Sequence, residues 1–338
     1  MRILLSGYFG FGNTGDEMIH AVLKERLLRE GFKISSLVKT PVNNEEIYRT
    51  HLKEIYSAIK SSDVVISGGG GLIQDKTSSK SFLYYLSILW LAKKLGKKSI
   101  VLAQGIGPVE KTLNKRLLKH VMNIIDLVIV RDNHSKEVLL ECGVTREISV
   151  TADLAFLYPS EEYAKPKEEY VLISFGKHKT NPSIELHAKI IEYIKNKINL
   201  PVLLLPLFPS IDTDIMKKIS ELTEVKLAIT SSMDKTISAF NNSVFVIGTR
   251  YHSLVISTMK QIPSLGLSYD PKVVSLAGEI AIPVLPYNDS LKLNEFAIAF
   301  EKAFSEREIT KNRLKNEFIK LKERAEENFK LLYDAILD

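Results

Sequence analysis

The chain has 338 residues, of which 45% are hydrophobic and 25% are charged, a composition typical of an ordinary soluble globular protein with about two domains. Its formal net charge is +6, but no basic block with interleaved aromatic residues occurs, which argues against nucleic-acid binding. One cysteine excludes a disulfide framework, and the seven histidines are not set at metal-ligand spacings, so we expect no metal site.

In the first half of the chain, short runs rich in β-branched residues alternate with helical patterns. The runs lie at residues 2–6, 34–38, 64–67, 99–103 and 127–130. An amphipathic segment over 18–30 follows the first run and is closed by Gly31, the residue type that commonly ends helices. Repeated units of strand and helix predict a parallel, doubly wound sheet.

The pattern breaks at residues 158–169, where prolines and charges predict a linker, and then restarts. The later runs lie at residues 170–175, 202–205, 225–229, 244–247 and 264–267. Beyond Ser290 two helical patterns follow without strands, the second with apolar residues at spacings of three and four. We therefore predict two Rossmann-like domains, 1–160 and 168–290, that face each other across a cleft. A helical tail over 291–338 is expected to pack back across them.

The most apolar window, residues 82–92, is about half of the roughly 20 residues that a membrane span needs, and it predicts a buried helix. Tyr84, Tyr85 and Trp90 within it would also suit a membrane surface, which leaves peripheral membrane contact as an alternative. The first 15 residues lack the pattern of a signal peptide, so we expect a cytoplasmic protein.

The segment after the first run, residues 7–17, holds four glycines that let the backbone turn tightly and approach a ligand. It contains a formal dinucleotide fingerprint, but the acids behind it would repel a pyrophosphate, and no fingerprint acid follows about 20 residues later. Asn13 or Thr14 is predicted to cap the next helix. Asp16 is interpreted as a hydrogen-bond acceptor for a hydroxylated substrate or as a base; an acid that merely favours the helix start is an equally strong alternative.

Glycine turns also follow two later runs, and ligands of open α/β sheets bind at such strand ends. Four consecutive glycines, residues 68–71, predict an anion-binding nest, with a close contact between strand and helix as the alternative. Together the candidate loop residues are Gly12, Asn13, Gly15, Asp16, Glu17, Gly69, Gly70, Gly71, Gln104, Gly105 and Gly107. Arg131 ends the fifth run and is a candidate ligand contact, with a local pair to Asp132 or a helix cap as the alternative.

After the run at 244–247 come Gly248 and then Arg250 and His252. A permanent cation and a titratable imidazole two residues apart suit an anionic substrate that must also be protonated. The alternative is an arginine and a histidine that cap a helix or form a salt bridge. Lys272 follows the next run and would add to an anion site. The other histidines are interpreted as structural or surface residues, His178 with the weakest support.

Taken together, these segments resemble the polysaccharide pyruvyl transferase family. The resemblance rests on Gly-Asn-Thr-Gly-Asp-Glu at 12–17, the glycines at 68–71, Gln-Gly-Ile-Gly-Pro at 104–108, Arg-Asp at 131–132, Asp-Leu-Ala-Phe at 153–156, Gly-Thr-Arg-Tyr-His-Ser at 248–253 and Tyr-Asp-Pro-Lys at 269–272. These segments occur in the family's order over nearly the whole chain. Leu154 departs from the family pattern, which has proline there, and this affects a turn rather than the chemistry.

The resemblance implies a fold similar to the glycosyltransferases of the B architecture and an enzyme without a required cofactor. Such an enzyme transfers the enolpyruvyl group of phosphoenolpyruvate to a sugar of a cell-wall or capsular polysaccharide precursor, forms a pyruvyl ketal and releases phosphate. On this basis Arg131, Arg250, Lys272 and Gly248 are predicted to bind the donor, and the second domain is expected to be the donor side. His252 is predicted to be the general acid or a phosphate contact.

Asp16, a predicted catalytic residue with Arg250 and His252, is placed on the acceptor side, in the first domain. Whether the acceptor is lipid-linked stays open; if it is, the enzyme works at the inner face of the membrane, with residues 82–92 or the basic surface as docking regions. Two other functions remain as alternatives. One is a nucleotide-sugar glycosyltransferase or epimerase of the same architecture, and the other is a non-catalytic protein that binds a sugar or a phosphate.

Overall fold

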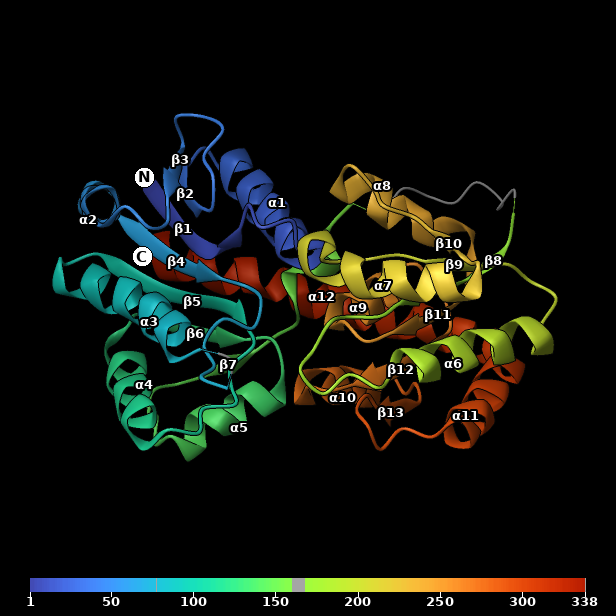
Figure 1. Cartoon of the computed structure of the whole chain (residues 1–338). Helices are drawn as coiled ribbons and strands as arrows, with labels where there is room; N and C mark the ends of the chain where they lie inside the picture. Colours follow the sequence, from blue (N-terminus) through green and yellow to red (C-terminus); the bar gives the residue numbers. More distant parts are fainter. Residues whose placement is uncertain (77, 160–167, 338) are drawn as a thin grey trace. The chain divides into compact units, whose positions relative to one another are not determined.

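The computed structural model describes residues 1–76, 78–159 and 168–337, and it contains two compact α/β units (Figure 1). The first unit comprises Met1–Tyr158 and Leu321–Asp338, and the second comprises Pro159–Lys320. Most of the predicted linker, residues 160–167, lies outside the described residues. Each unit is built on its own parallel sheet.

The described part of the first unit holds a seven-stranded parallel sheet with the order β3-β2-β1-β4-β5-β6-β7. Its strands are β1 (Arg2–Phe9), β2 (Lys33–Val38), β3 (Glu46–Tyr48), β4 (Val64–Gly68), β5 (Lys98–Gln104), β6 (Leu127–Val130) and β7 (Ser149–Val150). The direction in which strands are added reverses between β1 and β4. In open α/β sheets this reversal creates the crevice where ligands bind.

Helices pack against this sheet, and its central strands are therefore almost continuously apolar. The helical elements are α1 (Thr14–Arg29), α2 (Leu52–Ser61), α3 (Ser79–Lys94), α4 (Thr112–Ile124), α5 (Asn133–Glu141) and the short η1 (Leu154–Leu157). One core cluster joins α3 and α4 to β5 and β6 through Phe82, Leu89, Leu118 and Val128. The long α3 thus has a buried side and, as its exposed Trp90 shows, a side that faces solvent.

The second unit repeats the same topology over residues 168–320, where six described strands are ordered β10-β9-β8-β11-β12-β13. The strands are β8 (Tyr170–Ser174), β9 (Val202–Leu204), β10 (Lys226–Leu227), β11 (Ser243–Gly248), β12 (Ser264–Ser268) and β13 (Val284–Pro286). All of them pair in parallel. Here the order reverses between β8 and β11, which is the corresponding place for a ligand.

Helices also pack against the second sheet. They are α6 (Ile184–Lys197), α7 (Pro209–Thr223), α8 (Met233–Ser238), η2 (Ala239–Asn242), α9 (Tyr251–Met259), α10 (Pro271–Glu279) and α11 (Leu293–Ser305). The core on the α11 side contains three phenylalanines. Phe245 of β11 meets Phe300 edge-on at 5.6 Å between ring centroids, and Phe296 stacks on Phe300 at 5.8 Å.

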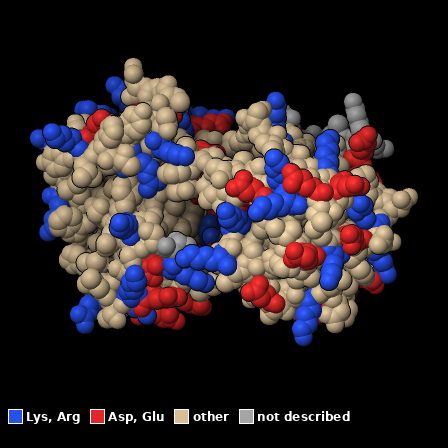
Figure 2. Space-filling view, viewed as in Figure 1, with Lys and Arg blue, Asp and Glu red and all other residues tan. Residues whose placement is uncertain are grey.

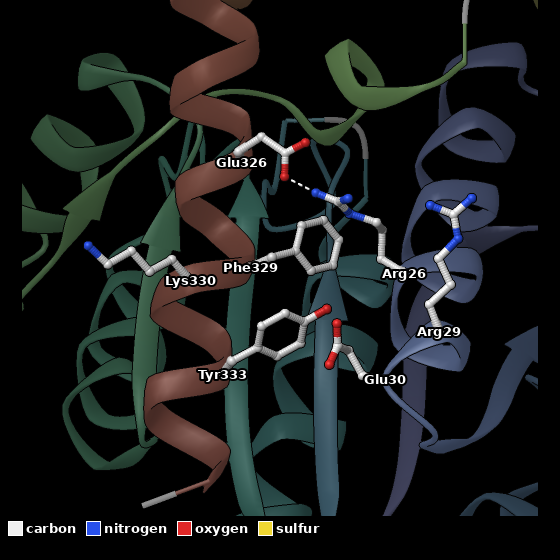
Figure 3. Close-up of a pocket in the computed structure, with 7 residues that line it drawn as sticks. All are labelled: Arg26, Arg29, Glu30, Glu326, Phe329, Lys330 and Tyr333. Carbon is white, nitrogen blue, oxygen red and sulfur yellow. Dashed lines mark ion pairs between the residues drawn. The ribbon is translucent and has the colours of Figure 1, made fainter.

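The last helix, α12 (Arg307–Leu337), contributes to both units, its residues from Leu321 onward belonging to the first. Asn328 is fully buried there, where it accepts a hydrogen bond from Thr151 Oγ1 at 2.7 Å and donates one to the Ala152 carbonyl at 3.0 Å. Arg26 of α1 forms an ion pair with Glu326, and both line a pocket of about 330 Å³ between α1 and α12 (Figure 3). The apolar stripe predicted for this helix is largely buried.

The prediction of two doubly wound parallel sheets is confirmed, and each of the ten predicted strands corresponds to a strand of the structure. Three short strands, β3, β7 and β13, were not predicted. Each has two or three residues and lies at the edge of its sheet, so its sequence carries no usable periodicity. Within the described residues, none of the helices combines the length and the apolar character needed to cross a membrane.

His20 on α1 is expected to make the stability of the first unit depend on pH. Its ring stacks on Phe9 at 4.2 Å and shares a 2.8 Å hydrogen bond with Ser36, and burial lowers its pKa from 6.5 to about 4. Because the folded state holds this imidazole neutral, its contribution is complete above pH 6.5 and is lost as the pH falls toward about 4. That difference in pKa corresponds to about 3 kcal/mol.

Urea unfolding at about pH 7 and about pH 4 tests this expectation. The loss of unfolding free energy on acidification should be smaller in His20→Gln than in the wild type, by up to about 3 kcal/mol. His120→Gln, which changes an exposed histidine, serves as the control and should behave like the wild type. Equal losses of unfolding free energy in His20→Gln and the wild type would show that His20 is not the source of the pH dependence.

Candidate functional site

In the first unit, Asp16 lies where the strand order reverses. It occupies the first turn of α1 and is only 7% exposed. A side-chain carbon added to Gly70, which follows β4, would stand 2.6 Å from Asp16 Oδ1. Gly70 also has a φ of +72°, so both its backbone and the available space favour glycine. The carboxylate of Asp16 therefore lies directly against the glycine loop.

The neighbouring glycines show the same close packing between strand end and helix. A side-chain carbon at Gly68 would lie 2.5 Å from Leu23, and one at Gly69 would lie 2.4 Å from Ile19. The alternative explanation for the glycine run, a close contact between strand and helix, is thus borne out at these positions. The anion-binding nest remains a prediction.

Glu17 fixes the loop that precedes α1. Its carboxylate accepts a 3.0 Å hydrogen bond from the Gly12 amide. Burial raises the pKa of Glu17, although backbone N–H groups of the loop oppose the shift. Asn13 occupies the predicted capping position but makes no side-chain cap hydrogen bond, so Glu17 is the side chain that braces this loop.

Gln104, at the end of β5, ties the glycine loops to one another. Its fully buried amide donates to the Gly69 carbonyl at 3.1 Å and accepts from Ser67 Oγ at 2.9 Å. The Gly105 amide also donates to the Gly70 carbonyl at 2.7 Å. The loops after β4 and β5 therefore behave as one connected rim, and Gln104 is its buried brace.

Arg49, which follows β3, forms a cluster that the sequence did not predict. Four rings of the described residues lie 4.6–5.9 Å from its guanidinium carbon, and they belong to Tyr8, Phe11, Tyr84 and Tyr85. Its Nη1 donates to Tyr85 Oη at 2.9 Å. Arg49 has no carboxylate partner within the described ranges, and it is only half-buried. We call these five residues the Arg49 cluster.

The Arg49 cluster is electropositive and lies close to Asp16. Lys39 stands 5.2 Å from the Phe11 ring, so two cations flank that ring. Burial raises the pKa of Tyr85, and the charge of Asp16 acts in the same direction, which places Asp16 within electrostatic range. The only indication of this cluster in the sequence was the pair of aromatic residues Tyr8 and Phe11 in the glycine-rich segment 7–17. The arginine could not be found because it lies in a segment without a predicted strand.

Arg131 is enclosed within the first unit. Its Nη1 lies 2.7 Å from Asp153 Oδ2, its Nε lies 3.5 Å from Asp132 Oδ2, and its side chain is 2% exposed. A side-chain carbon at Gly105 would lie 2.6 Å from the guanidinium. The alternative of a local pair with Asp132 is thus borne out. Direct contact between Arg131 and the donor stays a prediction, and in this conformation the guanidinium faces its own carboxylates.

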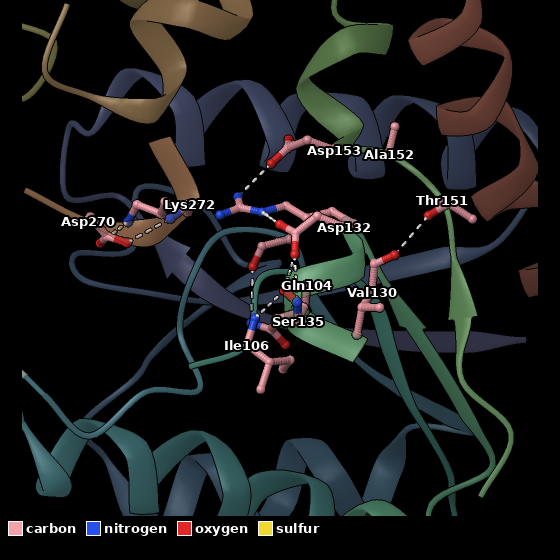
Figure 4. A network of polar contacts seen from close by, with 12 residues as sticks. Gln104, Ile106, Val130, Asp132, Ser135, Thr151, Ala152, Asp153, Asp270 and Lys272 are labelled. Atoms are coloured by element: carbon pink, nitrogen blue, oxygen red, sulfur yellow. Dashed lines mark hydrogen bonds and ion pairs between the residues drawn. The ribbon is translucent and has the colours of Figure 1, made fainter. Parts of the chain in front are cut away.

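Asp132 also caps α5 (Figure 4). Its Oδ1 accepts hydrogen bonds of 2.7 Å from both the amide and the hydroxyl of Ser135. The Ser135 hydroxyl in turn accepts from the Ile106 amide at 2.9 Å. This network connects the β5 rim to the start of α5, so Arg131 and its partners fix the shape of the loops.

In the second unit, Arg250 is held by a buried carboxylate. It occupies the N-cap position of α9 without a side-chain cap hydrogen bond. Asp212 of α7 binds it through two oxygens, with Nε to Oδ2 at 3.1 Å and Nη2 to Oδ1. Tyr269 Oη accepts from Nη1 at 3.0 Å. Asp212 is fully buried, whereas the Arg250 side chain is 20% exposed. Within the part of the chain that the structure describes, three of the five guanidinium N–H groups are therefore engaged in hydrogen bonds.

Two glycines make this arrangement possible. A side-chain carbon at Gly176, just after β8, would lie 2.7 Å from Arg250 Nε. One at Gly248 would lie 1.9 Å from Ser253 Oγ, so the turn from β11 into α9 requires glycine. Arg250 therefore lies over the backbone at the point where the strand order of the second sheet reverses.

His252 lies in the first turn of α9, two residues after Arg250, and is 9% exposed. Its ring meets Tyr251 edge-on at 5.2 Å. The amino end of a helix carries a partial positive charge, which favours an anion beside both residues. His178 packs against the same group of residues: its ring stacks at 4.3 Å on Tyr269, which accepts a hydrogen bond from Arg250.

Lys272 is engaged locally. Its Nζ lies 3.2 Å from Asp270 Oδ2, and its amide donates to Asp270 Oδ1 at 3.1 Å at the start of α10. Its role as a donor contact stays a prediction. Over residues 1–76, 78–159 and 168–337, no group of three or more His, Cys, Asp or Glu side chains is arranged to hold a metal ion.

Comparisons with known proteins give the family. Residues 13–271 match the family model described as polysaccharide pyruvyl transferase. A sequence comparison with curated proteins gives no significant match.

Solved structures give the fold. A putative UDP-N-acetylglucosamine 2-epimerase from Listeria monocytogenes has a TM-score of 0.62 at 12% identity, over 92% of this chain and 90% of its own. A glycosyltransferase from Rickettsia africae has a TM-score of 0.62 at 12% identity, over 99% and 98% of the two chains. A Neisseria meningitidis UDP-GlcNAc 2-epimerase, bound to UDP-GlcNAc, has a TM-score of 0.60 at 13% identity over 100% of both chains. The predicted similarity to glycosyltransferases of the B architecture is confirmed at the level of fold.

Replacing Asp212 is expected to destabilise the second unit strongly. Asp212→Asn keeps the side-chain shape but leaves the Arg250 charge without its buried partner, and breaking such a pair costs about 3–5 kcal/mol. Asp214→Asn, two positions along the same helix and exposed, is the matched control and should change stability by less than about 0.5 kcal/mol. Denaturant unfolding followed by circular dichroism measures both, and similar midpoints for the two variants would contradict the structural role of Asp212.

Proposed function

Because the chain belongs to the polysaccharide pyruvyl transferase family, we propose that it transfers the enolpyruvyl group of phosphoenolpyruvate to a sugar of a polysaccharide precursor. The family supports a transferase with a polysaccharide substrate. The donor, the ketal product and the residue roles are parts of the proposal. The observation that carries it is the partly exposed Arg250 beside His252 at the amino end of α9.

The donor side is assigned to the second unit. Phosphoenolpyruvate carries a carboxylate and a phosphate, and the planar guanidinium fork matches either group. Asp212 holds the orientation of Arg250 before a ligand arrives, so little side-chain freedom is lost on binding. The backbone N–H groups at the start of α9 supply further donors for an oxyanion.

The reaction needs a proton at the methylene carbon of the donor. Protonation there creates an oxocarbenium-like centre at C2, an acceptor hydroxyl attacks C2, and a second hydroxyl closes the ketal as the bond to phosphate breaks. His252 is proposed as the acid because it is the imidazole next to Arg250. One of the two hydroxyl protons restores His252, and the other leaves with phosphate or to solvent.

The acceptor side is assigned to the first unit. Asp16 is proposed to accept a hydrogen bond or a proton from an acceptor hydroxyl, since its carboxylate lies at the reversal of strand order. The partly exposed rings of the Arg49 cluster, those of Tyr8, Phe11 and Tyr84, are proposed to offer apolar faces for a sugar ring. Arg49 and Lys39 supply positive charge for a phosphate on the acceptor. An acceptor that is a phosphorylated or diphosphate-linked sugar fits this combination.

His252→Ala is expected to lower the rate of phosphate release from phosphoenolpyruvate in the presence of acceptor by about 100- to 10,000-fold, the usual contribution of a general acid. The matched control, His51→Ala, removes an exposed histidine of the first unit and should leave the rate unchanged. Phosphate release and the added pyruvyl mass on a panel of nitrophenyl and lipid-linked sugars measure the effect. A near-normal rate in His252→Ala would contradict the acid role.

Ligand-induced thermal stabilisation separates this proposal from a nucleotide-sugar enzyme of the same fold. Stabilisation by phosphoenolpyruvate is expected, and it should be reduced in Arg250→Lys because the planar fork is lost. Stabilisation by UDP-sugars without any by phosphoenolpyruvate would favour a glycosyltransferase or epimerase instead.

Arg49→Gln is expected to raise the KM for a phosphorylated acceptor by about 10- to 100-fold, since a hydrogen bond to a charged group contributes about 1.5–3 kcal/mol. The KM for phosphoenolpyruvate should stay the same, because the donor is assigned to the other unit. Arg29→Gln, an exposed arginine on α1, is the control. A raised KM for the donor instead, or an equal effect on acceptors without phosphate, would contradict the assignment of Arg49.

A further inference from the structure

The outer faces of α3 and α4 form an apolar surface in the first unit. Between the two helices an open pocket of about 270 Å³ is lined mainly by Leu83, Leu86, Trp90, Leu117 and Val121. Leu83 and Trp90 are 42% and 39% exposed. Single exposed apolar residues are ordinary, but several that border one pocket indicate a contact surface.

Spacing explains why these residues share a face. On α3, Lys80, Leu83, Ser87, Trp90 and Lys94 follow each other at intervals of three and four, so they form one stripe along the helix. The stripe is apolar in the middle and carries a lysine at each end. The Nζ atom of Lys94 lies over the Trp90 ring, 5.7 Å from its centroid, so this charge stands at the face of the exposed indole.

Helix α4 also has exposed apolar residues next to a basic residue. Leu113, which is 65% exposed, and Leu117 lie one turn apart, with Arg116 exposed beside them. We call Leu83, Trp90, Leu113 and Leu117, together with Lys80, Lys94 and Arg116, the α3–α4 patch.

The charge on the two helices has only one sign. Neither α3 (Ser79–Lys94) nor α4 (Thr112–Ile124) contains an aspartate or a glutamate. Lys80, Lys94 and Arg116 make no ion pair within the part of the chain that the structure describes. Figure 2 shows separate Lys and Arg side chains over this face, while Asp and Glu gather over α5.

We propose that the α3–α4 patch docks on the surface of a bilayer that contains anionic phospholipids. Basic side chains near such a surface attract its headgroups, and leucine and tryptophan side chains enter the boundary between headgroups and acyl chains. The chain binds the surface without crossing it, since none of the helices in the described residues suits a membrane span.

The uniform charge favours a bilayer over another protein. Protein interfaces usually pair potentials of opposite sign residue by residue, and lysine is depleted in them. Two lysines and an arginine around an apolar centre that contains a tryptophan match an interface with a uniformly negative, deformable surface. The proposal does not depend on the reaction proposed above, because it concerns a face of α3 that carries no assigned catalytic residue.

Flotation with vesicles tests the proposal on the full chain. The wild type should float with vesicles of phosphatidylcholine mixed with phosphatidylglycerol, float poorly with phosphatidylcholine alone, and be released by high salt. Combining Lys80→Ala, Lys94→Ala and Arg116→Ala should lower the partition onto anionic vesicles by about 100-fold, since each basic residue near the surface contributes about fivefold. Leu83→Ser with Trp90→Ser should also weaken binding.

Matched controls remove the same number of basic residues and of exposed apolar residues elsewhere. The control for charge combines Lys218→Ala, Lys311→Ala and Lys315→Ala, all exposed in the second unit, and the apolar control combines Ile298→Ser with Ile309→Ser. Both should float like the wild type. Thermal unfolding confirms that each variant is folded.

Three results would overturn the proposal. They are equal flotation of the patch variants and the wild type, equal flotation with both vesicle types, and no flotation at all. If light scattering instead showed a dimer that the patch variants abolish, the surface would be an interface between copies of this chain. Phosphate release with a water-soluble acceptor is measured in parallel. Its absence would count against the proposed function and leave the flotation result unaffected.

Discussion

In both units an arginine lies across a glycine at the end of a central strand and is held there by a buried aspartate. Arg131 does so over Gly105 with Asp153, and Arg250 does so over Gly176 with Asp212. The glycine is required because any side chain would occupy the space of the guanidinium. The aspartate is required because a buried cation is costly without its partner. The loops that form each sheet edge are arranged around this contact.

The two arginines differ in one respect that bears on function. Arg131 has a 2% exposed side chain between two carboxylates, so its charge is used within the protein. The Arg250 side chain is 20% exposed, although its only carboxylate partner in the described residues, Asp212, is fully buried. The same pairing thus gives a structural element in one unit and, in the other, the arginine that we propose as an anion contact. Solvent access, rather than residue type, separates the two roles.

The sequence was sufficient for the parts that follow from local pattern. Strand runs, glycine turns, and the positions of Arg131 and Arg250 at strand ends all came from residues close together in the chain. Asp212 could not be assigned as the partner of Arg250 because 38 positions separate them. Arg49 was missed for a related reason, since its surrounding rings come from two segments, residues 8–11 and 84–85, that are both distant from it in the chain. Long-range partners become visible only when the fold brings them together.

Helix α3 contributes side chains both to the Arg49 cluster and to the α3–α4 patch. Tyr84 and Tyr85 face Arg49, whereas Leu83 and Trp90 lie on the pocket that faces outward. A helix with its side chains is about 10–12 Å across. A bilayer at the outer face would therefore stand roughly one helix diameter from the Arg49 cluster. This fixed distance between the bilayer surface and Arg49 would favour acceptors whose charged linkage lies about one helix diameter from the lipid.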